Sequence, residues 1–510
     1  MLSHTKSFGL NGITGYLVEV EIDLNNGLPS YETVGLPDTA VKEGKERVHS
    51  AIKNSGYNYP ALKIVVNLAP ASTKKEGSLY DLAISVGILC ATGQIEQNKC
   101  KDYIFLGELG LNGELRKING VLPILISAKE QGYKKIILPK KNQKEASFIE
   151  GVEVYTAGSL EEVINLLKSE VKIEPIETSN YALLKERVQN AGDFKLVKGQ
   201  KSAKRALEIA AAGGHNVLMI GPPGSGKTML AKCFSSILPD MSFEEALETT
   251  KIHSIAGVLD SKIGILTTRP FRAPHHTATM VALTGGGKNS KPGEISLAHN
   301  GVLFLDEMPE YPRSVVEVLR QPLEDGTIVV SRAAQTIEYP ANFTLIASMN
   351  PCPCGYYGSK KQLCRCTPSQ IHKYLNKLSG PLMDRIDLHI EVDSVEYSDL
   401  KSNKEEENSQ NIKVRVDFAK EVQQKRFLNS KIHNNASMTH EQFKNYCKLN
   451  DESENLLKTA FETLNLSARA HDRILKVART IADLDGCESI KLEHIAEAIQ
   501  YRSLDRKYFI

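Results

Sequence analysis

The sequence GPPGSGKT at residues 221–228 restricts the fold of this chain more than any other feature. It matches the spacing G-x-x-x-x-G-K-[ST], in which the backbone N–H groups of a glycine-rich loop surround phosphate oxygens. The apolar run NVLMI precedes it at residues 216–220, and the helical pattern TMLAKCFSSIL follows it. A buried strand, a tight loop and a helix in this order predict an α/β core that binds a nucleotide. The alternative, a glycine- and proline-rich turn before a helix, does not explain both flanks.

The side chains of this loop have distinct expected roles. Lys227 would neutralise charge on the β- and γ-phosphates, and the Thr228 hydroxyl would ligate Mg²⁺. The sequence therefore predicts ATP and Mg²⁺ as cofactors. The residues expected to bind them in this loop are Gly221, Gly224, Ser225, Gly226, Lys227 and Thr228.

Two further apolar runs end in polar residues suited to the same site. The run VLFL at residues 302–305 leads into Asp306, which can hold Mg²⁺, and Glu307, which can act as general base toward water. The run FTLIASMN ends at Asn350, which could sense the γ-phosphate and orient the attacking water. A turn residue at a strand end is the alternative interpretation of Asn350.

The chain of 510 residues is long enough for several domains. Mixed α and β patterns predict an amino-terminal α+β domain over residues 1–170, followed by a polar linker over residues 171–192. Alternating apolar runs and helical patterns predict the α/β core over residues 193–395. A charged stretch at 396–412 opens a carboxyl-terminal region, 396–510, in which only helical patterns follow.

Composition narrows the class of protein. A net charge of +2 excludes a globally basic nucleic-acid binder but leaves room for local basic surfaces. The amino-terminal sequence shows no secretory signal pattern, and no apolar run reaches membrane-spanning length. The cysteines outside residues 352–366 are scattered and odd in number. We therefore expect a cytoplasmic protein with reduced thiols and no membrane association.

The ordered motifs resemble those of the AAA+ ATPases. GPLMDRIDL, residues 380–388, resembles the segment that carries the arginine finger, which implies that Arg385 reaches a neighbouring subunit's γ-phosphate. A guanidinium suits this task because its charge is permanent and its fork is planar. LSARAHDRILKVA resembles the sensor 2 helix, which implies a catalytic role for Arg469, with Arg473 one turn later as the competing candidate.

Other segments resemble the magnesium-chelatase-like branch of the AAA+ proteins, specifically the YifB/ComM family. They are RPFRAPHHTAT, GGGKNSKPGEISLAHNGVLFLDE and HIAEAIQYRSLDRK. The resemblance covers nearly the whole chain. It implies a homo-oligomeric, hexameric ring that hydrolyses ATP between subunits, with residues 396–510 as a helical lid displaced by a long helix, 413–427.

Two hairpin inserts are expected in the core. SKIGILTTRPFRAPHHTATMVAL, residues 261–283, is predicted to form one, and GTIVVSRAAQTIEYP, residues 326–340, the other. The second resembles the pre-sensor hairpin of helicase-type rings. The basic residues that could line a pore and contact DNA are Arg269, Arg272, Lys288 and Arg332.

The amino-terminal domain resembles the Lon-protease fold, and Ser78 beside lysines suggests a serine–lysine hydrolase. In that fold, however, the nucleophile position corresponds here to Leu79 and the lysine position to Leu122. Because a serine without a positioned base is a weak nucleophile, we expect a non-peptidase domain for assembly or substrate binding.

Four of the nine cysteines form a C-x-C, nine-residue, C-x-C pattern within residues 352–366. Four thiolates can close a tetrahedral Zn²⁺ site without an open catalytic position. The alternative is free or redox-active thiols. The loop also contains Tyr356, Tyr357 and Arg365, which could contact single-stranded nucleic acid or form an ordinary solvated loop. The candidate zinc ligands are Cys352, Cys354, Cys364 and Cys366.

The YifB/ComM resemblance implies a DNA translocase or helicase that promotes branch migration during DNA uptake and recombination, acting on single-stranded or branched DNA. The alternative is a protein-remodelling or chelatase-type ATPase with no DNA substrate, because fold alone does not determine the substrate. A non-hydrolytic nucleotide switch is disfavoured by the presence of both Glu307 and Arg385.

Overall fold

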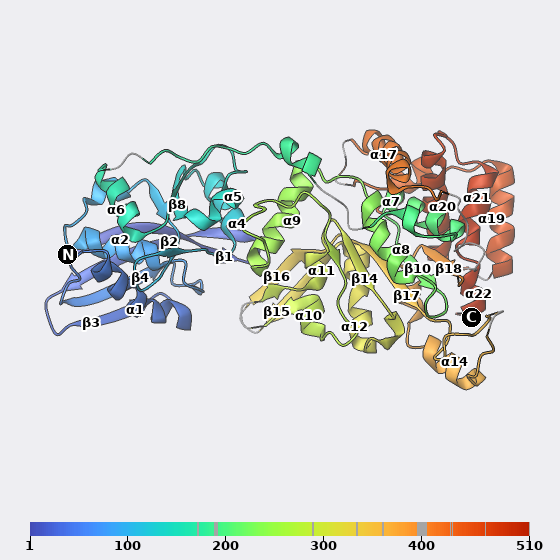
Figure 1. Cartoon of the computed structure of the whole chain (residues 1–510), viewed down its shortest axis with the longest axis horizontal. Helices are drawn as coiled ribbons and strands as arrows, with labels where there is room; N and C mark the ends of the chain where they lie inside the picture. The colour runs from blue at the N-terminus through green and yellow to red at the C-terminus, as the bar shows by residue number, and fades with distance from the viewer. Residues whose placement is uncertain are drawn as a thin grey trace.

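The computed structural model describes residues 1–170, 173–187, 192–287, 290–332, 335–359, 362–394, 405–428, 430, 432–464 and 466–508. The molecule is elongated, with the amino-terminal sheet at one end, a second sheet in the middle and the carboxyl-terminal helices at the other end (Figure 1). Among the described residues, no helix is both long and apolar enough to cross a membrane.

The amino-terminal region contains a seven-stranded mixed sheet in the order β3-β4-β2-β1-β5-β8-β9. On β2, the alternate residues Val18, Val20 and Ile22 are all fully buried, as on the core-facing side of a strand. Helices cover the sheet, and the apolar helix α2 is buried along its whole length. The strands are β1 (Leu2–Asn11), β2 (Thr14–Asn25), β3 (Ser30–Val34), β4 (Lys63–Ala69), β5 (Tyr103–Phe105), β6 (Glu108–Leu109), β7 (Leu115–Arg116), β8 (Lys135–Pro139) and β9 (Glu153–Ala157). The helices are α1 (Thr39–Asn54), α2 (Asp81–Ala91), α3 (Gln97–Cys100), α4 (Val121–Glu130), α5 (Gln143–Ala146) and α6 (Leu160–Lys168).

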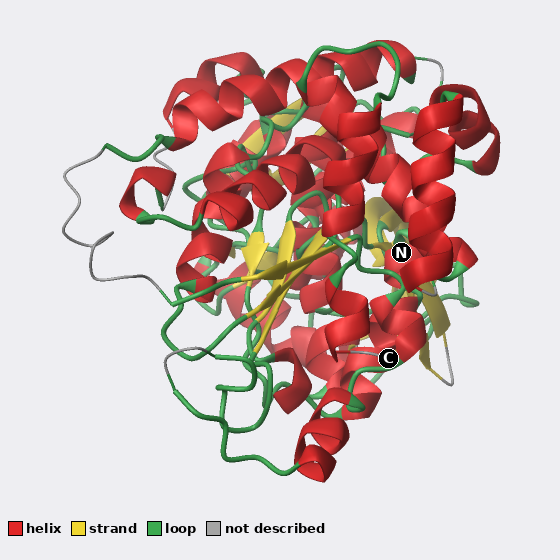
Figure 2. Cartoon of the chain, turned by 90° about the vertical axis from the view of Figure 1, so that its right-hand side faces the viewer, coloured by secondary structure: helices red, strands yellow, loops and turns green. Residues whose placement is uncertain are grey.

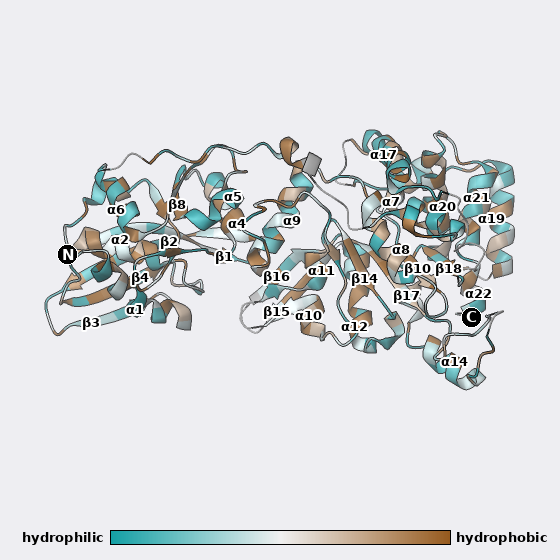
Figure 3. Ribbon diagram, in the orientation of Figure 1, coloured by the Kyte–Doolittle hydropathy of each residue, from teal (hydrophilic) through white to brown (hydrophobic). Residues whose placement is uncertain are grey.

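The central region contains a five-stranded parallel sheet in the order β11-β14-β17-β10-β18. Its inner strands are buried on both faces, which explains their continuous apolar sequences. Brown hydrophobic residues mark these strands in Figure 3. The strands are β10 (Val217–Ile220), β11 (Phe271–Arg272), β14 (Val302–Leu305), β17 (Thr344–Met349) and β18 (Leu388–Glu391). The principal helices are α7 (Lys201–Gly213), α8 (Lys227–Phe234), α9 (Phe243–Ala256) and α14 (Pro368–Leu375), with the shorter α10 (Met280–Thr284), α11 (Glu294–Leu297), α12 (Arg313–Glu317), α13 (Pro322–Asp325) and α15 (Gly380–Met383).

One of the two expected hairpins is confirmed and the other is wrong. Strands β15 (Thr327–Arg332) and β16 (Gln335–Pro340) pair antiparallel, as predicted. Within residues 261–283, however, Phe271–Arg272 form the edge strand β11, which pairs parallel with β14. The sequence pattern concealed this because a two-residue strand has no measurable periodicity. A small antiparallel pair follows, formed by β12 (Gly285–Gly286) and β13 (Lys291–Pro292).

The carboxyl-terminal region is helical, as expected, and packs against the end of the central sheet (Figure 2). Its first helix begins earlier than predicted, at Ser409, because the Asn408 side chain caps it by accepting the N–H of Asn411 at 2.9 Å. Of the charged stretch at 396–412, residues 396–404 lie outside the described residues. The helices are α17 (Ser409–Arg426), α18 (His440–Tyr446), α19 (Asp451–Leu464), α20 (Ala468–Leu484), α21 (Leu492–Gln500) and α22 (Leu504–Tyr508).

The amino-terminal region docks on helix α9 of the central region. The Gly120 N–H donates to Ser254 Oγ at 3.0 Å, and Ser254 in turn donates to the buried carboxylate of Glu145. Lys117 Nζ donates to the carbonyl of Leu259 at 2.8 Å. The two regions are therefore joined by buried polar contacts as well as by the intervening chain.

Candidate nucleotide site

The phosphate loop follows β10 at the carboxyl edge of the parallel sheet. Gly224 and Gly226 have φ angles of 75° and 90°, which side chains rarely tolerate. At Gly221, a Cβ atom would collide with the carbonyl oxygen of Val392. The glycines that the motif requires therefore have a steric reason in this chain.

Neighbouring backbone carbonyls hold Lys227 in place. Its side chain is 9% exposed, and Nζ donates to the carbonyl oxygens of Gly221 at 2.8 Å and Pro222 at 2.9 Å. Asn350 Oδ1 lies 3.4 Å from the same nitrogen, so the expected sensor residue does reach the phosphate loop. Burial lowers the pKa of Lys227, and the nearby carboxylates of Asp306 and Glu307 oppose that shift. An anionic phosphate beside Nζ would, like these carboxylates, raise the pKa of Lys227 and so favour its charged form.

Thr228, in the first turn of α8, and Asp306, just after β14, come together at the carboxyl edge of the sheet. Thr228 Oγ1 donates to Asp306 Oδ2 at 2.8 Å, which brings together the two oxygen donors expected for Mg²⁺. Ser348 on β17 donates to the other carboxylate oxygen of Asp306. Sequence reasoning missed Ser348, although its place two residues before Asn350 on an apolar strand was a visible signal.

Glu307 has an unusual backbone conformation. Its φ of 52° is in the left-handed region, and its N–H donates to Ser348 Oγ at 3.1 Å. Such strain at a non-glycine residue persists only where the surrounding structure holds it. The side chain is exposed at the carboxyl edge of the sheet, where a water molecule attacking a bound phosphate would lie.

Arg385 lies at the opposite edge of the same sheet. It precedes β18, whose residues Leu388 and Glu391 pair with Val217 and Ile220 of β10. A four-residue strand spans about 13 Å, so Arg385 is separated from the chain's own phosphate loop by the length of the sheet. Arg385 therefore has a geometry suited to a site on another molecule.

The Arg385 side chain is only 8% exposed and partly satisfied. Its Nη1 donates to the carbonyl of Pro381 at 2.6 Å, and its Nη2 pairs with Glu324. Its buried Nε has no hydrogen-bond partner within the described chain. Sequence reasoning missed Glu324, because nothing local connects it to a residue so distant in the chain.

Three further arginines gather around Arg385. Burial lowers the pKa of Arg385, and the positive charges of Arg469, Arg320 and Arg473 lower it further. Arg473 pairs with the buried carboxylate of Asp387. Burial raises the pKa of Asp387, but Arg473 and His215 together outweigh it and hold the pKa below its usual range. Arg469 is exposed at the start of α20. The structure thus assigns Arg473 a structural ion pair and leaves Arg469 available to an external anion.

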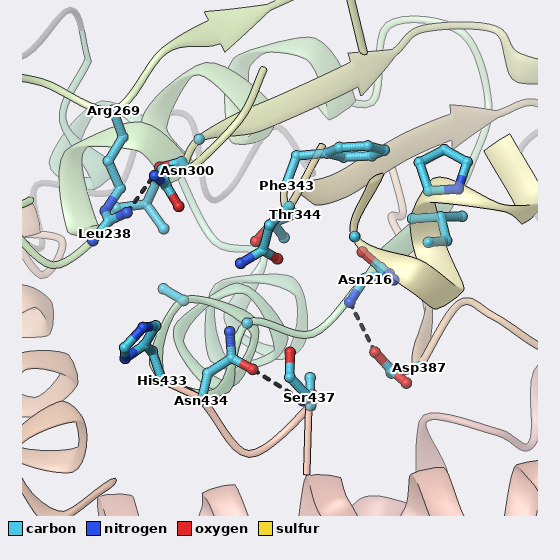
Figure 4. Close-up of a pocket in the computed structure, with 18 of the residues that line it drawn as sticks. Asn216, Leu238, Arg269, Asn300, Phe343, Thr344, Asp387, His433, Asn434 and Ser437 are labelled. Atoms are coloured by element: carbon cyan, nitrogen blue, oxygen red, sulfur yellow. Dashed lines mark hydrogen bonds between the residues drawn. The ribbon is translucent and has the colours of Figure 1, made fainter. Parts of the chain in front are cut away.

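Two of the expected DNA contacts are engaged within the chain. Arg269 donates to the carbonyls of Pro239 and Asn300 and pairs with Glu245 at 2.8 Å. It lines a polar cavity of about 600 Å³ between the amino edge of the sheet and the carboxyl-terminal helices (Figure 4). The guanidinium of Arg272 holds the Glu294 carboxylate with two bonds of 2.6 and 2.7 Å.

In the single chain the guanidinium groups of Arg269 and Arg272 are already bonded to Glu245 and Glu294, and their contact with DNA stays a prediction. The other two candidates also stay predictions. Lys288 and the side chain of Arg332 lie outside the described residues.

The serine of the amino-terminal region has a carboxylate partner. Ser78 Oγ donates to Glu108 Oε2. The nearby Lys75 is fully buried and donates to the carbonyl of Pro70. The absence of peptidase activity stays a prediction of the sequence.

The four cysteines of residues 352–366 converge on one point. All four sulfur atoms lie within 4.8 Å of one another, with Cys352 Sγ 3.4 Å from Cys354 Sγ and 3.7 Å from Cys364 Sγ. Four thiolates around Zn²⁺ would be about 3.8 Å apart, given tetrahedral bonds of about 2.3 Å. The backbone N–H of Tyr357 points to Cys352 Sγ at 3.3 Å, as in the outer contacts of metal-bound thiolates.

Known proteins match this chain along nearly its full length. The family models "Subunit ChlI of Mg-chelatase", "Magnesium chelatase, subunit ChlI" and "Magnesium chelatase, subunit ChlI C-terminal" match residues 20–142, 193–400 and 406–502. The Competence protein ComM of Haemophilus influenzae is 44% identical over 97% of this chain and 96% of that protein.

YifB of Escherichia coli is 45% identical over the same shares of the two chains. The Magnesium-chelatase 38 kDa subunit of Cereibacter sphaeroides is more distant, at 28% identity over 31% of this chain and 52% of that protein. With a full-length match of this strength and the AAA+ arrangement of its central sheet, the chain belongs to the YifB/ComM family of magnesium-chelatase-like AAA+ proteins.

Proposed function

We propose that this protein is a ring-forming ATPase in which each nucleotide is shared between two subunits. The observation that carries the proposal is the separation of the phosphate loop and Arg385 on opposite edges of one sheet. Arg385 offers a buried Nε without an acceptor, and Arg469 stands exposed beside it. A second copy of the chain could present its bound triphosphate to this cationic edge.

In this arrangement each residue has one task. The loop amides and Lys227 would bind the phosphates. Thr228 and Asp306 would hold Mg²⁺, which would neutralise negative charge on the β- and γ-phosphate oxygens. Glu307 would accept a proton from the attacking water, and Asn350 would orient that water. Arg385 and Arg469 from the neighbouring subunit would stabilise the negative charge that develops on the γ-phosphate oxygens.

We infer that the substrate moved by the ring is DNA, and that the activity is translocation or helicase action that supports branch migration. The support is the full-length similarity to a competence protein and the presence of the hairpin formed by β15 and β16. The shorter similarity to a magnesium-chelatase subunit favours the alternative, a chelatase-type or protein-remodelling ATPase. This similarity covers only part of the chain, so we rank the alternative function second.

We expect single-stranded or forked DNA to stimulate ATP hydrolysis several-fold. DNA binding should weaken by about 10³–10⁵ between about 50 and 200 mM salt if six to ten phosphate contacts form. The measurement is the steady-state ATPase rate with single-stranded, forked and duplex DNA at both salt concentrations. A rate that no DNA changes at low salt would favour the alternative function.

We also propose that Cys352, Cys354, Cys364 and Cys366 hold one structural Zn²⁺. Their sulfur positions fit a tetrahedral site, and the N–H contacts to sulfur support bound thiolates. Protein purified without chelators should contain one zinc per chain by elemental analysis. Cys364→Ser should lose the metal, whereas Cys487→Ser, outside the cluster, should keep it. Zinc well below one equivalent in the unaltered protein would contradict this proposal.

A further inference from the structure

The four-cysteine loop is continuous with the nucleotide site. Strand β17 ends at Met349, whose carbonyl accepts the N–H of Gly221 at 3.2 Å. Asn350 follows and reaches Lys227, and the fully buried Cys352 comes two residues later. Only Pro351 therefore separates Asn350, whose side chain reaches Lys227, from the first thiol.

The same loop touches the phosphate loop from outside. Gly355 is buried with a φ of 84°, and a Cβ atom built there would lie 2.5 Å from Pro223 Cδ and 2.8 Å from Pro223 Cγ. Both the backbone conformation and the lack of space require glycine. The backbone of Gly355 thus rests directly on the outer face of the loop that surrounds the phosphates.

The thiol cluster determines where Gly355 lies. The described residues between Cys352 and Cys366 include no helix and no strand, so regular backbone bonding does not support them. The Gly355 N–H donates to the carbonyl of Cys352 at 2.9 Å. In the chain, Gly355 comes directly after Cys354 and before Cys364, and both of these thiols belong to the cluster. Two residues after Gly355, the ring of Tyr357 makes an edge-to-face contact with the ring of Tyr508 of α22, with 6.4 Å between the ring centroids.

From these contacts we propose that the four-cysteine loop braces the phosphate loop, so that metal loading of the cysteines sets the affinity for nucleotide. The inference rests on the proposed nucleotide and zinc sites. A bound metal would cross-link the two halves of the loop and hold Gly355 against Pro223. Without it, four like-charged or protonated thiols have no reason to stay together, and the phosphate loop loses its outer support.

The test is the affinity for a fluorescent, non-hydrolysable ATP analogue, measured by anisotropy in excess Mg²⁺. For the unaltered protein, a zinc-selective chelator should weaken binding at least tenfold, and added Zn²⁺ should restore it. Cys366→Ser should weaken binding to a similar degree, while Cys487→Ser should have no effect. Because metal removal is reversible in one sample, misfolding of a variant cannot imitate this result.

A second variant separates the contact from the metal. Gly355→Ala keeps all four thiols but places a methyl group against Pro223. It should retain one zinc per chain and still bind nucleotide several-fold more weakly. The inference is overturned if metal removal leaves the analogue affinity within twofold of its starting value, or if Gly355→Ala leaves it unchanged.

Different results would contradict the nucleotide site, the metal site and the coupling between them. Unaltered protein that binds no analogue contradicts the nucleotide site, and unaltered protein that contains no zinc contradicts the metal site. If both ligands bind but neither affects the other, only the coupling between them is wrong.

Discussion

Glu307→Gln is expected to lower the rate of ATP hydrolysis by about 10²–10⁴, the usual contribution of a general base, while nucleotide still binds. The carboxylate is exposed beside Asp306, and the proposed Mg²⁺ ligands are Thr228 and Asp306 rather than Glu307. Lys227→Ala is expected instead to weaken binding itself, because Nζ is the buried cation at the phosphate loop. Rates and analogue affinities measured on the same preparations distinguish these two effects.

The matched control is Glu310→Gln. Glu310 is also exposed, three residues further along, and pairs with Lys377 at 3.5 Å. It should change neither rate nor affinity by more than twofold. If Glu310→Gln and Glu307→Gln reduced turnover equally, the general base would not be Glu307.

Arg385→Ala is expected to lower the rate of ATP hydrolysis by about 10³–10⁵, as loss of an arginine finger does. The substitution leaves the chain's own phosphate loop unchanged. Mixing it with Lys227→Ala protein should restore part of the activity. At a mixed interface, the Arg385→Ala subunit supplies an intact phosphate loop and the Lys227→Ala subunit supplies an intact arginine. The measurement is the ATPase rate across a series of mixing ratios, with a maximum expected between the two inactive end points.

Two outcomes would contradict a shared site. One is a mixing series in which no ratio of the two variants is active, although an independent measurement shows that their subunits exchange. The other is an Arg385→Ala protein with normal turnover. Arg320→Ala serves as the control, since Arg320 is in the same cationic cluster but pairs with Glu317 at 3.1 Å. Its effect should be much smaller than that of Arg385→Ala.

The ion pair with Glu324 fixes the orientation of the Arg385 side chain within the single chain. Glu324 occupies one side of the guanidinium, and Nε has no acceptor. The arginine is thus already oriented within the chain, ready for the neighbouring subunit of the proposed ring. An oriented, poorly hydrated guanidinium loses less entropy when it meets a phosphate oxygen.

The sequence alone determined the α/β core, the phosphate loop and the positions of Asp306 and Glu307. These features depend on residues close together along the chain, where spacing, apolar runs and glycine requirements are directly visible. The two C-x-C pairs predicted a possible metal site, but the nine residues between them could also hold the pairs far apart, so the convergence of the sulfur atoms came from the structure.

Only the tertiary structure decided which cations are available and which loops touch. It showed Arg269, Arg272 and Arg473 bound to acidic residues within the chain. It also brought Gly355 against Pro223 and placed Arg385 across the sheet from the phosphate loop. Such contacts join residues far apart in sequence, and a residue's own neighbours in the chain carry no information about them. The physical reason is that a charge or a glycine acquires its role from what packing places beside it.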